Sequence, residues 1–546
     1  MRLILGAAQR GEVRPLVLLG ALLVITIAAA LPGPAVNVAP YVALLLGLTL
    51  LHARVLSWKS LLALTIAIIL FIPIRRYTMP GSLPFELEPY RLMVAFLGAG
   101  WMVSMLVDNR VRLRSSGLEA PLVLFGFGAL ASIVVNTGHI NALAVQDVVL
   151  KKLTFFASFY LILYLIVSVA HSRQLIDWIV KWLVAGGAIV SAFAIYEAWT
   201  GFNIFSNLQP FIPILDLAFA PELDVRGSRL RVFASAQHPI ALGVAFVMLL
   251  PLAVYLAKKY RQRRWFLACG VIVLACFSTV SRTTILMLVI VFIVFLRLRP
   301  RETKRLWRVL LPGLIVVHLA LPGALGTLQE SFFPEGGLIA EQQAGAGGRG
   351  SGRLADVGPS LDEWKRQFVL GQGFGTRVVD EGRINAMILD NQWLGTLLET
   401  GLVGVIAWIW LFRRFLKLVN AEARRDRSDR GWLLTALSAS VLAYALAMLT
   451  YDAWSFIQVT FLLFILLGVG AVALQQREET VPARTLEPAP TPLGVLEVPV
   501  PATVSPAYGT SLPARRSGLV GLAKLPNLLF ALGLVLSFQA VRSRER

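Results

Sequence analysis

The sequence is poor in the residues that build metal and redox sites. It contains two cysteines, Cys269 and Cys276, and five histidines that are scattered along the chain. The cysteines are seven residues apart on one predicted helix, about 10 Å along its axis, so a disulfide cannot join them. There is no Cys-x-x-Cys pair, no His-Glu-x-x-His motif and no P-loop. We therefore expect no bound metal and no cofactor.

Charged residues are scarce as well, and this indicates a membrane protein. Only 15% of the residues are charged, 57% are hydrophobic, and the mean hydropathy is positive. Apolar runs of about 17–22 residues recur along the chain, and such runs cross a bilayer as helices because lipid offers no partners to the backbone. The predicted fold is all-α: a polytopic transmembrane helical bundle of about 12–15 spans, with a large outer loop that contains short helices. The predicted spans lie near residues 15–32, 35–53, 59–75, 91–107, 119–137, 152–170, 176–199, 236–257, 265–280, 283–298, 308–323, 393–412, 431–450 and 453–474.

Acidic residues are outnumbered by lysine and arginine, 31 to 51, which gives a net charge of +20. This charge could attract nucleic acid, but the basic residues lie mainly in short connections between spans, as in the cytoplasmic loops of membrane proteins. Three arginines near the N-terminus place it inside the cell, and the basic clusters at 258–264, 297–308 and 413–430 then fall on the same side. With this topology the two long connections, about 200–235 and 324–392, lie on the outer face.

We expect the chain to have four parts. Residues 1–175 form N-terminal transmembrane helices, and residues 176–474 form the membrane region that carries the outer loop 324–392. Residues 475–517 are rich in proline, threonine and valine, and this composition predicts a disordered cytoplasmic tail. The final apolar segment, 518–546, either spans the membrane or lies at its surface.

The end of the large outer loop places polar groups directly before a span. It runs through GQGFGT (371–376) into LDNQWLGTLLETGLVG (389–404). The glycines of the first motif indicate a tight turn. Gly-x-Gly-x-Gly alone is only weak evidence for a phosphate site. Asp390 either caps the free N–H groups of the helix start or acts as a general base. Glu399 is expected to pair with an intramembrane arginine. A long outer loop such as 324–392 usually forms a lid or a binding loop.

Basic residues on the predicted outer side indicate an anionic partner, because guanidinium groups match phosphate oxygens. Arg282 lies between two spans of only about 16 residues, so we expect it below the outer surface, bound to substrate or paired with an acid. Arg229 and Arg231 precede His238, which opens a span and either contacts substrate or caps the helix. Arg353 follows a glycine-rich stretch. Contact with lipid headgroups is the simpler reading for Arg75, Arg76, Arg91, Lys151 and Lys152.

These motifs resemble, in order, those of the O-antigen ligase and polymerase superfamily of bacterial envelope glycosyltransferases, over roughly residues 175–470. RVFASAQHPIALGVAFVMLLPL (231–252) is similar to the family's Arg-x-x-Gly-x-Phe-x-x-Pro-Asn segment and the span after it. STVSRTT (278–284) is similar to its Ser-Arg turn. SGRL with VLGQGFGT (351–376) and LDNQWLGTLLETGLVG resemble the remaining motifs around one outer loop.

The resemblance implies a metal-independent glycosyltransferase of the inner (plasma) membrane, with its active site on the periplasmic or extracellular side. The donor would be a polyprenyl-diphosphate-linked glycan and the acceptor a hydroxyl of a glycan, lipid or protein, with no nucleic acid involved. Residues 176–474 would then be the catalytic membrane region.

The resemblance also assigns residues. Arg231, Arg282 and Arg353 fall on family arginines thought to hold the diphosphate, and we add Arg229, His238 and Asn391 as predicted substrate contacts. Asp390 stands where the family has a histidine that activates the acceptor, so Asp390 and Arg282 are the predicted catalytic residues. The aspartate favours a polymerase or a more distant glycan transferase over a lipid A-core ligase.

The main alternative is a transporter or flippase of a lipid-linked glycan or another anion, with the arginines lining its path. A structural or regulatory membrane subunit is a third reading. The enzyme is favoured because the charges cluster on one side and the sequence shows no inverted repeat.

Overall fold

The computed structural model describes residues 57–80, 87–107, 111–170, 172–219, 225–226, 229–334, 337, 356–377 and 389–476. The chain divides into two compact units, residues 1–478 and 479–546, and every described residue belongs to the first. The predicted spans 15–32 and 35–53, nearly all of the tail 475–517 and the final segment 518–546 lie outside the described residues.

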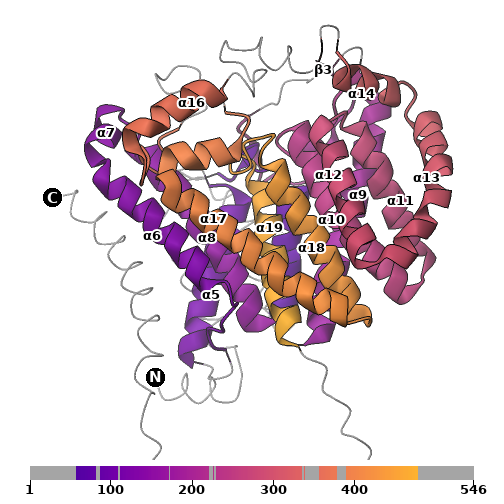
Figure 1. Cartoon of the computed structure of the whole chain (residues 1–546), viewed down its shortest axis with the longest axis horizontal. Coiled ribbons are helices and arrows are strands. Elements are labelled where there is room, and N and C mark those ends of the chain that lie inside the picture. The colour runs from indigo at the N-terminus through magenta and orange to yellow at the C-terminus, as the bar shows by residue number, and fades with distance from the viewer. Residues whose placement is uncertain are drawn as a thin grey trace, which may run out of the picture. The chain divides into compact units, whose positions relative to one another are not determined.

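The described part consists mainly of helices with almost no strands, which confirms the all-α prediction (Figure 1). Two small antiparallel pairs are its only strands: β1 (Tyr77–Thr78) pairs with β2 (Asp216–Leu217), and β3 (Val225–Arg226) with β4 (Arg229–Leu230). The helices, in chain order, are α4 (Trp58–Phe71), α5 (Pro89–Val107), α6 (Glu119–Val135), α7 (Thr137–Ala142), α8 (Gln146–Val169), α9 (Arg173–Thr200), η2 (Ile204–Ser206), α10 (Pro239–Tyr260), α11 (Arg263–Ser278), α12 (Arg282–Leu298), α13 (Pro300–Ala320), α14 (Ala324–Phe332), α16 (Val357–Trp364), η3 (Lys365–Gln367), α17 (Gln392–Arg425), α18 (Asp429–Ala447) and α19 (Ile457–Gln475).

Every predicted span within the described part overlaps one of these helices. Seven of the described helices are long and apolar enough to cross a membrane, or eight if a bent pair counts as one span. That pair corrects the prediction for 308–323: the end of α13 and α14 meet at 106° instead of forming a straight span. The chain turns at Gly323, whose φ of 83° suits glycine. Helices α11 and α12 are as short as expected, with 16 and 17 residues.

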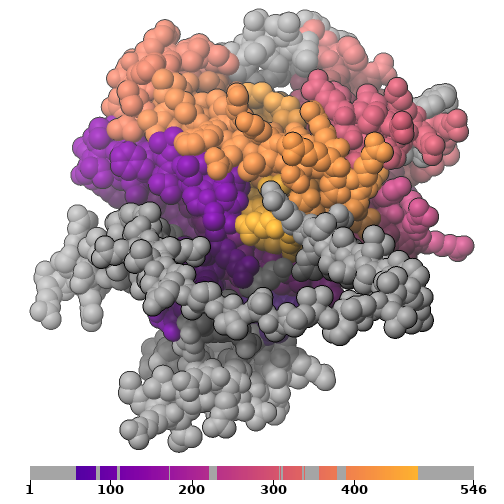
Figure 2. Space-filling model, turned by 60° about the horizontal axis from the view of Figure 1, so that its bottom comes forward, coloured from indigo at the N-terminus to yellow at the C-terminus, as the bar shows by residue number. Residues whose placement is uncertain are grey.

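The core of the bundle lies around α10, α18 and α19, whose side chains are nearly all buried. Helix α10 packs against α9, α11, α12 and α18, while α19 packs against α8 and α18. Helix α17 packs against α18 and α6 (Figure 1), and the space-filling view shows the orange surface of this region next to the indigo surface of the first described helices (Figure 2). On its other side α6 exposes a stripe of large apolar side chains, as expected where a helix faces lipid: Val123, Phe127, Leu130 and Val134.

Helix α17 is interrupted at Gly401, which has the non-helical angles φ 62° and ψ −157°. The interruption removes two helical hydrogen bonds and so frees two C=O and two N–H groups, and all four find other partners. The carbonyl of Leu398 accepts from the Gln372 N–H at 2.8 Å, and the carbonyl of Glu399 accepts from the Ser132 hydroxyl at 2.6 Å. The N–H groups of residues 402 and 403 donate to the carbonyls of residues 368 and 369 at 3.2 and 3.3 Å. The segment 368–376 and α6 therefore repair the break.

The glycine-rich motif makes this repair possible, and its prediction as a tight turn is confirmed. Gly371, Gly373 and Gly375 have φ values of 66°, 122° and 84°, a region that glycine occupies without strain. A Cβ atom on Gly371 would lie 2.5 Å from the Leu398 carbonyl oxygen and 2.7 Å from the Gly401 nitrogen. The two backbones can approach this closely only because side chains are absent.

Replacing Gly401 with alanine should destabilise the fold. The backbone angles at Gly401 are essentially restricted to glycine, so alanine there costs about 1–3 kcal/mol in strain, and its Cβ would also collide with the Val369 carbonyl. Gly126→Ala is the matched control, because a Cβ in the middle of α6 meets no atom within 4 Å. Thermal unfolding of the purified protein in detergent should show a lower midpoint for Gly401→Ala alone. Equal midpoints for the two variants would contradict this account.

Candidate active site

The segment from Arg231 to His238 is held in place by Arg76, in the connection after α4, and by the end of α9. Arg76 is buried, and its guanidinium donates to the Ala236 carbonyl at 3.1 Å and to the Ser206 hydroxyl at 3.2 Å. It also lies 5.0 Å from the centre of the Phe233 ring. Burial lowers the pKa of Arg76 to about 10, so it stays a cation at neutral pH. Arg76 is thus a structural clamp, which corrects its interpretation as a headgroup contact.

A second clamp comes from the last turn of α9. The Glu197 carboxylate accepts the backbone N–H groups of Phe233 and Ala234 at 3.3 and 2.9 Å. Arg231, only 6% exposed, follows β4 directly and begins this fixed segment. Its backbone position is therefore set by contacts that are far apart in sequence.

His238 is the N-cap of α10, since its Nδ1 accepts the Ile240 N–H at 3.1 Å. Pro239 occupies the first helical turn, as the sequence predicted. The imidazole stacks on Phe456, with ring centres 5.7 Å apart and planes at 28°. The capping interpretation of His238 therefore holds in the structure, and its contact with substrate stays a prediction.

Arg282 is the first residue of α12 and is half-buried. The turn before it is tight, with Val280 at φ 46°. It packs closely on α10, where a Cβ on Gly243 would lie 3.1 Å from the Thr279 hydroxyl. The next residue, Thr283, shares a hydroxyl–hydroxyl hydrogen bond of 2.9 Å with Thr450. Arg282 is thereby tied to the connection between α18 and α19.

At the start of α17 the cap is Asn391 and not Asp390. The Asn391 Oδ1 accepts the N–H groups of residues 393 and 394 at 3.0 and 3.2 Å. The neighbouring Gln392 makes three hydrogen bonds with the α18–α19 connection. Its N–H donates to the carbonyls of residues 448 and 451 at 2.8 and 3.1 Å, and its Oε1 accepts from the Trp454 N–H at 2.7 Å. Asp390, half-buried, directly precedes the cap.

One connection thus contacts the starts of α10, α12 and α17. We call residues 448–456 the α18–α19 loop; the contacts are those of Phe456, Thr450 and Met448 described above. Helix starts carry partial positive charge and free N–H groups, which favour anions. The loop therefore contacts the three helix starts that carry or adjoin His238, Arg282 and Asp390, and the partial positive charge of these starts favours an anion.

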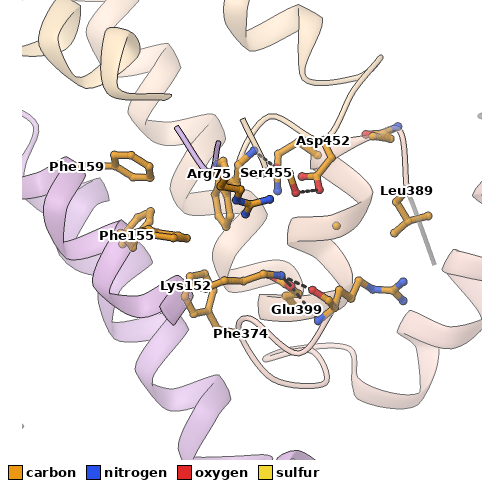
Figure 3. A pocket seen from close by; sticks show the side chains of 15 residues that line it. Arg75, Lys152, Phe155, Phe159, Phe374, Leu389, Glu399, Asp452 and Ser455 are labelled. Atoms are coloured by element: carbon orange, nitrogen blue, oxygen red, sulfur yellow. Dashed lines mark hydrogen bonds and ion pairs between the residues drawn. The ribbon is translucent and has the colours of Figure 1, made fainter. Parts of the chain in front are cut away.

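A cavity of about 60 Å³ lies between α8, the start of α17 and this loop (Figure 3). Phe155, Phe159, Phe374 and Trp454 supply aromatic walls. Figure 3 shows Asp452 and Ser455 at one side and Lys152 and Glu399 at another. The full lining is Arg75, Lys152, Phe155, Phe156, Phe159, Phe374, Arg377, Leu389, Asn391, Gln392, Gly395, Glu399, Asp452, Trp454 and Ser455.

Two basic residues of this cavity are held in ion pairs. The Lys152 ammonium lies 3.0 Å from Glu399 Oε1 and also donates to the Arg377 carbonyl. The Arg377 guanidinium pairs with Glu363 at 2.7 Å. The prediction that Glu399 pairs with an arginine was wrong. The spacing of residues along one span does not reveal which helix packs against it. Lys152 is likewise an ion-pair partner and not a headgroup anchor.

Asp452 accepts the hydroxyl of Ser455 in the same loop. Burial raises the pKa of Asp452 above its ordinary value, while the Ser455 hydroxyl and the Lys152 ammonium act in the opposite direction. Sequence reasoning missed Lys152, Asp452 and Ser455 as site residues. The only signal was a carboxylate in the short connection between two strongly apolar helices.

Two predicted residues cannot be placed. Arg353 lies outside the described residues, and Arg229 belongs to β4 but its side chain is not described. No three histidine, cysteine, aspartate or glutamate side chains come together as metal ligands within the part of the chain that the structure describes.

Residues 267–409 match the family model described as O-antigen ligase. This part of the chain is similar to an O-antigen ligase domain. A comparison with curated proteins gave no match. The domain runs from α11 into α17 and contains Arg282, the glycine turn and Asp390, whereas Arg231, His238 and the α18–α19 loop lie outside the matched residues.

The domain supports the O-antigen ligase and polymerase superfamily that the motifs indicated. It implies glycan transfer at the membrane, with lipid-linked glycan donors and glycan acceptors in general. Together with the apolar helices, it identifies a multi-pass protein of the inner membrane.

Proposed function

We propose that the protein is a metal-independent glycosyltransferase that acts on the outer face of the cytoplasmic membrane. It transfers or polymerises glycan from a polyprenyl-diphosphate donor onto an acceptor hydroxyl. The observation that carries this proposal is the meeting of three helix starts, with Arg282, His238 and Asp390 on them or beside them, at the α18–α19 loop. An O-antigen ligase domain supplies the class of reaction.

The diphosphate is the part of the donor that this region suits best. Arg282 stands at the first position of α12, so its guanidinium and the free N–H groups of that helix favour the same anion. Arg231 is the second basic group, at the beginning of the clamped segment before α10. Fixed cations of this kind stabilise the charge that develops on a leaving diphosphate.

The reaction needs one proton transfer. The acceptor oxygen attacks the anomeric carbon of the donor sugar, the bond from that carbon to the diphosphate oxygen breaks, and the hydroxyl proton passes to a base. Asp390 is the proposed base because it directly precedes the α17 start and lies between Leu389 and Asn391, which both line the cavity. Arg282 neutralises the leaving group.

The sidedness of the site follows from the opposite ends of the same helices. Helix α10 ends with Lys258 and Lys259, α12 with Arg297, and α17 with Arg424 and Arg425. Lysine and arginine at the ends of spans face the cytoplasm. Since each of these helices begins at the candidate site, the site faces outward.

Labelling of single cysteines tests this orientation. With Cys269 and Cys276 replaced by alanine, Asp362→Cys in α16 and Arg425→Cys at the end of α17 each give one exposed thiol. In intact cells or spheroplasts, a membrane-impermeant maleimide should label the cysteine at 362, and should label that at 425 only after lysis. The reverse pattern would place the site in the cytoplasm.

Removal of Arg282 should abolish most transfer without unfolding the protein. Deleting one group that stabilises developing charge costs about 100- to 1000-fold in turnover, so we expect a loss of that size for Arg282→Ala in a reconstituted transfer assay. Arg282→Lys should keep part of the activity, since it keeps the charge but not the bidentate fork. Arg263→Ala, an exposed arginine at the start of α11, is the control. Flipping of the lipid carrier without new glycosidic bonds would instead support a transporter.

The role of Asp390 is tested by changing charge and length separately. Loss of a general base lowers turnover by about 100- to 10,000-fold, so Asp390→Asn should fall in this range while Asp390→Glu retains more activity. Single-turnover rates with preloaded donor separate this effect from binding. Wild-type rates in both variants would show that the carboxylate takes no part in the reaction.

A further inference from the structure

The aromatic cavity differs chemically from the arginine region beside it. Its lysine and one of its arginines are already neutralised by carboxylates, in the pairs Lys152–Glu399 and Arg377–Glu363. A further carboxylate, Asp452, lines it together with Arg75. With Glu363 counted, three acidic groups balance the three basic groups of the lining, so the cavity suits a ligand without net negative charge.

The walls favour a ring that has one apolar face. Trp454 is packed among aromatic rings, with Phe125, Phe156 and Phe374 at centroid distances of 5.3, 5.8 and 6.0 Å. Phe155 and Phe159 lie on the α8 side (Figure 3). Sugar rings present C–H groups to the electron-rich faces of aromatic rings, and their hydroxyls donate to carboxylates. Paired charges beside aromatic walls therefore form an environment that suits a sugar.

The size of the cavity sets a limit. Its 60 Å³ is several times the roughly 10–15 Å³ that one water molecule needs on the same measure. It holds the hydroxyl-bearing part of one sugar unit and not a long oligosaccharide.

The position also fits, because the α18–α19 loop belongs to both regions. Thr450 contacts the residue after Arg282, and Asp452, two residues further along, lines the cavity. A sugar in the cavity and a diphosphate at Arg282 would therefore share one rigid element.

We infer that this cavity is a sugar-binding subsite, in which the carboxylates of Asp452 and Glu399 accept hydrogen bonds from the hydroxyls of one sugar unit that lies against Trp454 and the α8 aromatic rings. The inference rests on the proposed function for the source of the sugar, which is a unit of the donor or of the acceptor glycan. Ser455 and Lys152 are positioning residues that orient the two carboxylates.

Binding of soluble sugars tests the subsite without any transfer reaction. The full chain in nanodiscs is mixed with methyl glycosides of glucose, galactose, mannose and N-acetylglucosamine, and contact is measured by saturation-transfer difference NMR. At least one glycoside should bind the wild type, and Asp452→Asn should weaken it about tenfold or more, the loss of a hydrogen bond to a charged group. Asp362→Asn, an exposed carboxylate on α16, should bind like the wild type. Thermal unfolding confirms that both variants are folded.

Pyrophosphate separates this cavity from the arginine region. Its binding should fall in Arg282→Ala and remain in Asp452→Asn. The inference is overturned if no glycoside binds the wild type, if Asp452→Asn binds as tightly as Asp362→Asn, or if Asp452→Asn strengthens pyrophosphate binding, which would place the anion in the cavity.

Transfer kinetics identify the source of the sugar. A rise in KM for the acceptor alone in Asp452→Asn assigns the cavity to the acceptor, and a rise for the donor alone assigns it to the donor. If the protein binds glycosides through Asp452 but transfers no glycan, the subsite stands and the proposed function is refuted. If Asp452→Asn transfers glycan normally and binds glycosides as the wild type does, the proposed function stands and the subsite is refuted.

Discussion

The arrangement of the site depends on how four peptide groups are satisfied where α17 is interrupted. In lipid, a helix cannot be broken unless the freed N–H and C=O groups find partners within the protein. At Gly401 the partners are the backbone of residues 368, 369 and 372 and the hydroxyl of Ser132. The first part of α17 therefore takes its direction from the glycine turn and α6, and not from the long helix that continues after the break. Asn391 and Glu399 are placed by this constraint, since both lie in or next to that first part.

The second organising element is the α18–α19 loop. It bonds to a hydroxyl at the α12 start, stacks on the imidazole ring at the α10 start and shares three hydrogen bonds with the α17 start. Three helix starts with partial positive charge thus meet on one side, while the basic ends of the same helices lie on the other. Beside this region lies a cavity in which Lys152 and Arg377 are neutralised by carboxylates. A lipid diphosphate that carries a sugar has the same two chemical parts.

The sequence predicted the helices well, because the length of an apolar run reports directly on its passage through lipid. The run at 308–323 was the exception, since its bend between α13 and α14 comes from local geometry at Gly323 and not from a loss of hydrophobicity. The glycine turn was also predictable, although its docking on Gly401 was not. Motif resemblance pointed to Arg282 and Asp390, and both lie at helix starts that meet the same loop. Contacts between distant helices could not be read from spacing, and for this reason Arg76 and Lys152 were interpreted as headgroup anchors and Asp452 was missed.

The docking of residues 368–376 on α17 also restricts what can move. A lid must detach from the protein and return. Detachment of this segment would leave one carbonyl and two N–H groups of a membrane helix without partners, at several kcal/mol each. This stretch is therefore a permanent part of the scaffold, although it belongs to the long connection from which a lid was expected. Any opening for a bulky lipid substrate has to come from segments that leave these hydrogen bonds intact, so the backbone beside the proposed base and the proposed sugar subsite stays in place while a substrate enters.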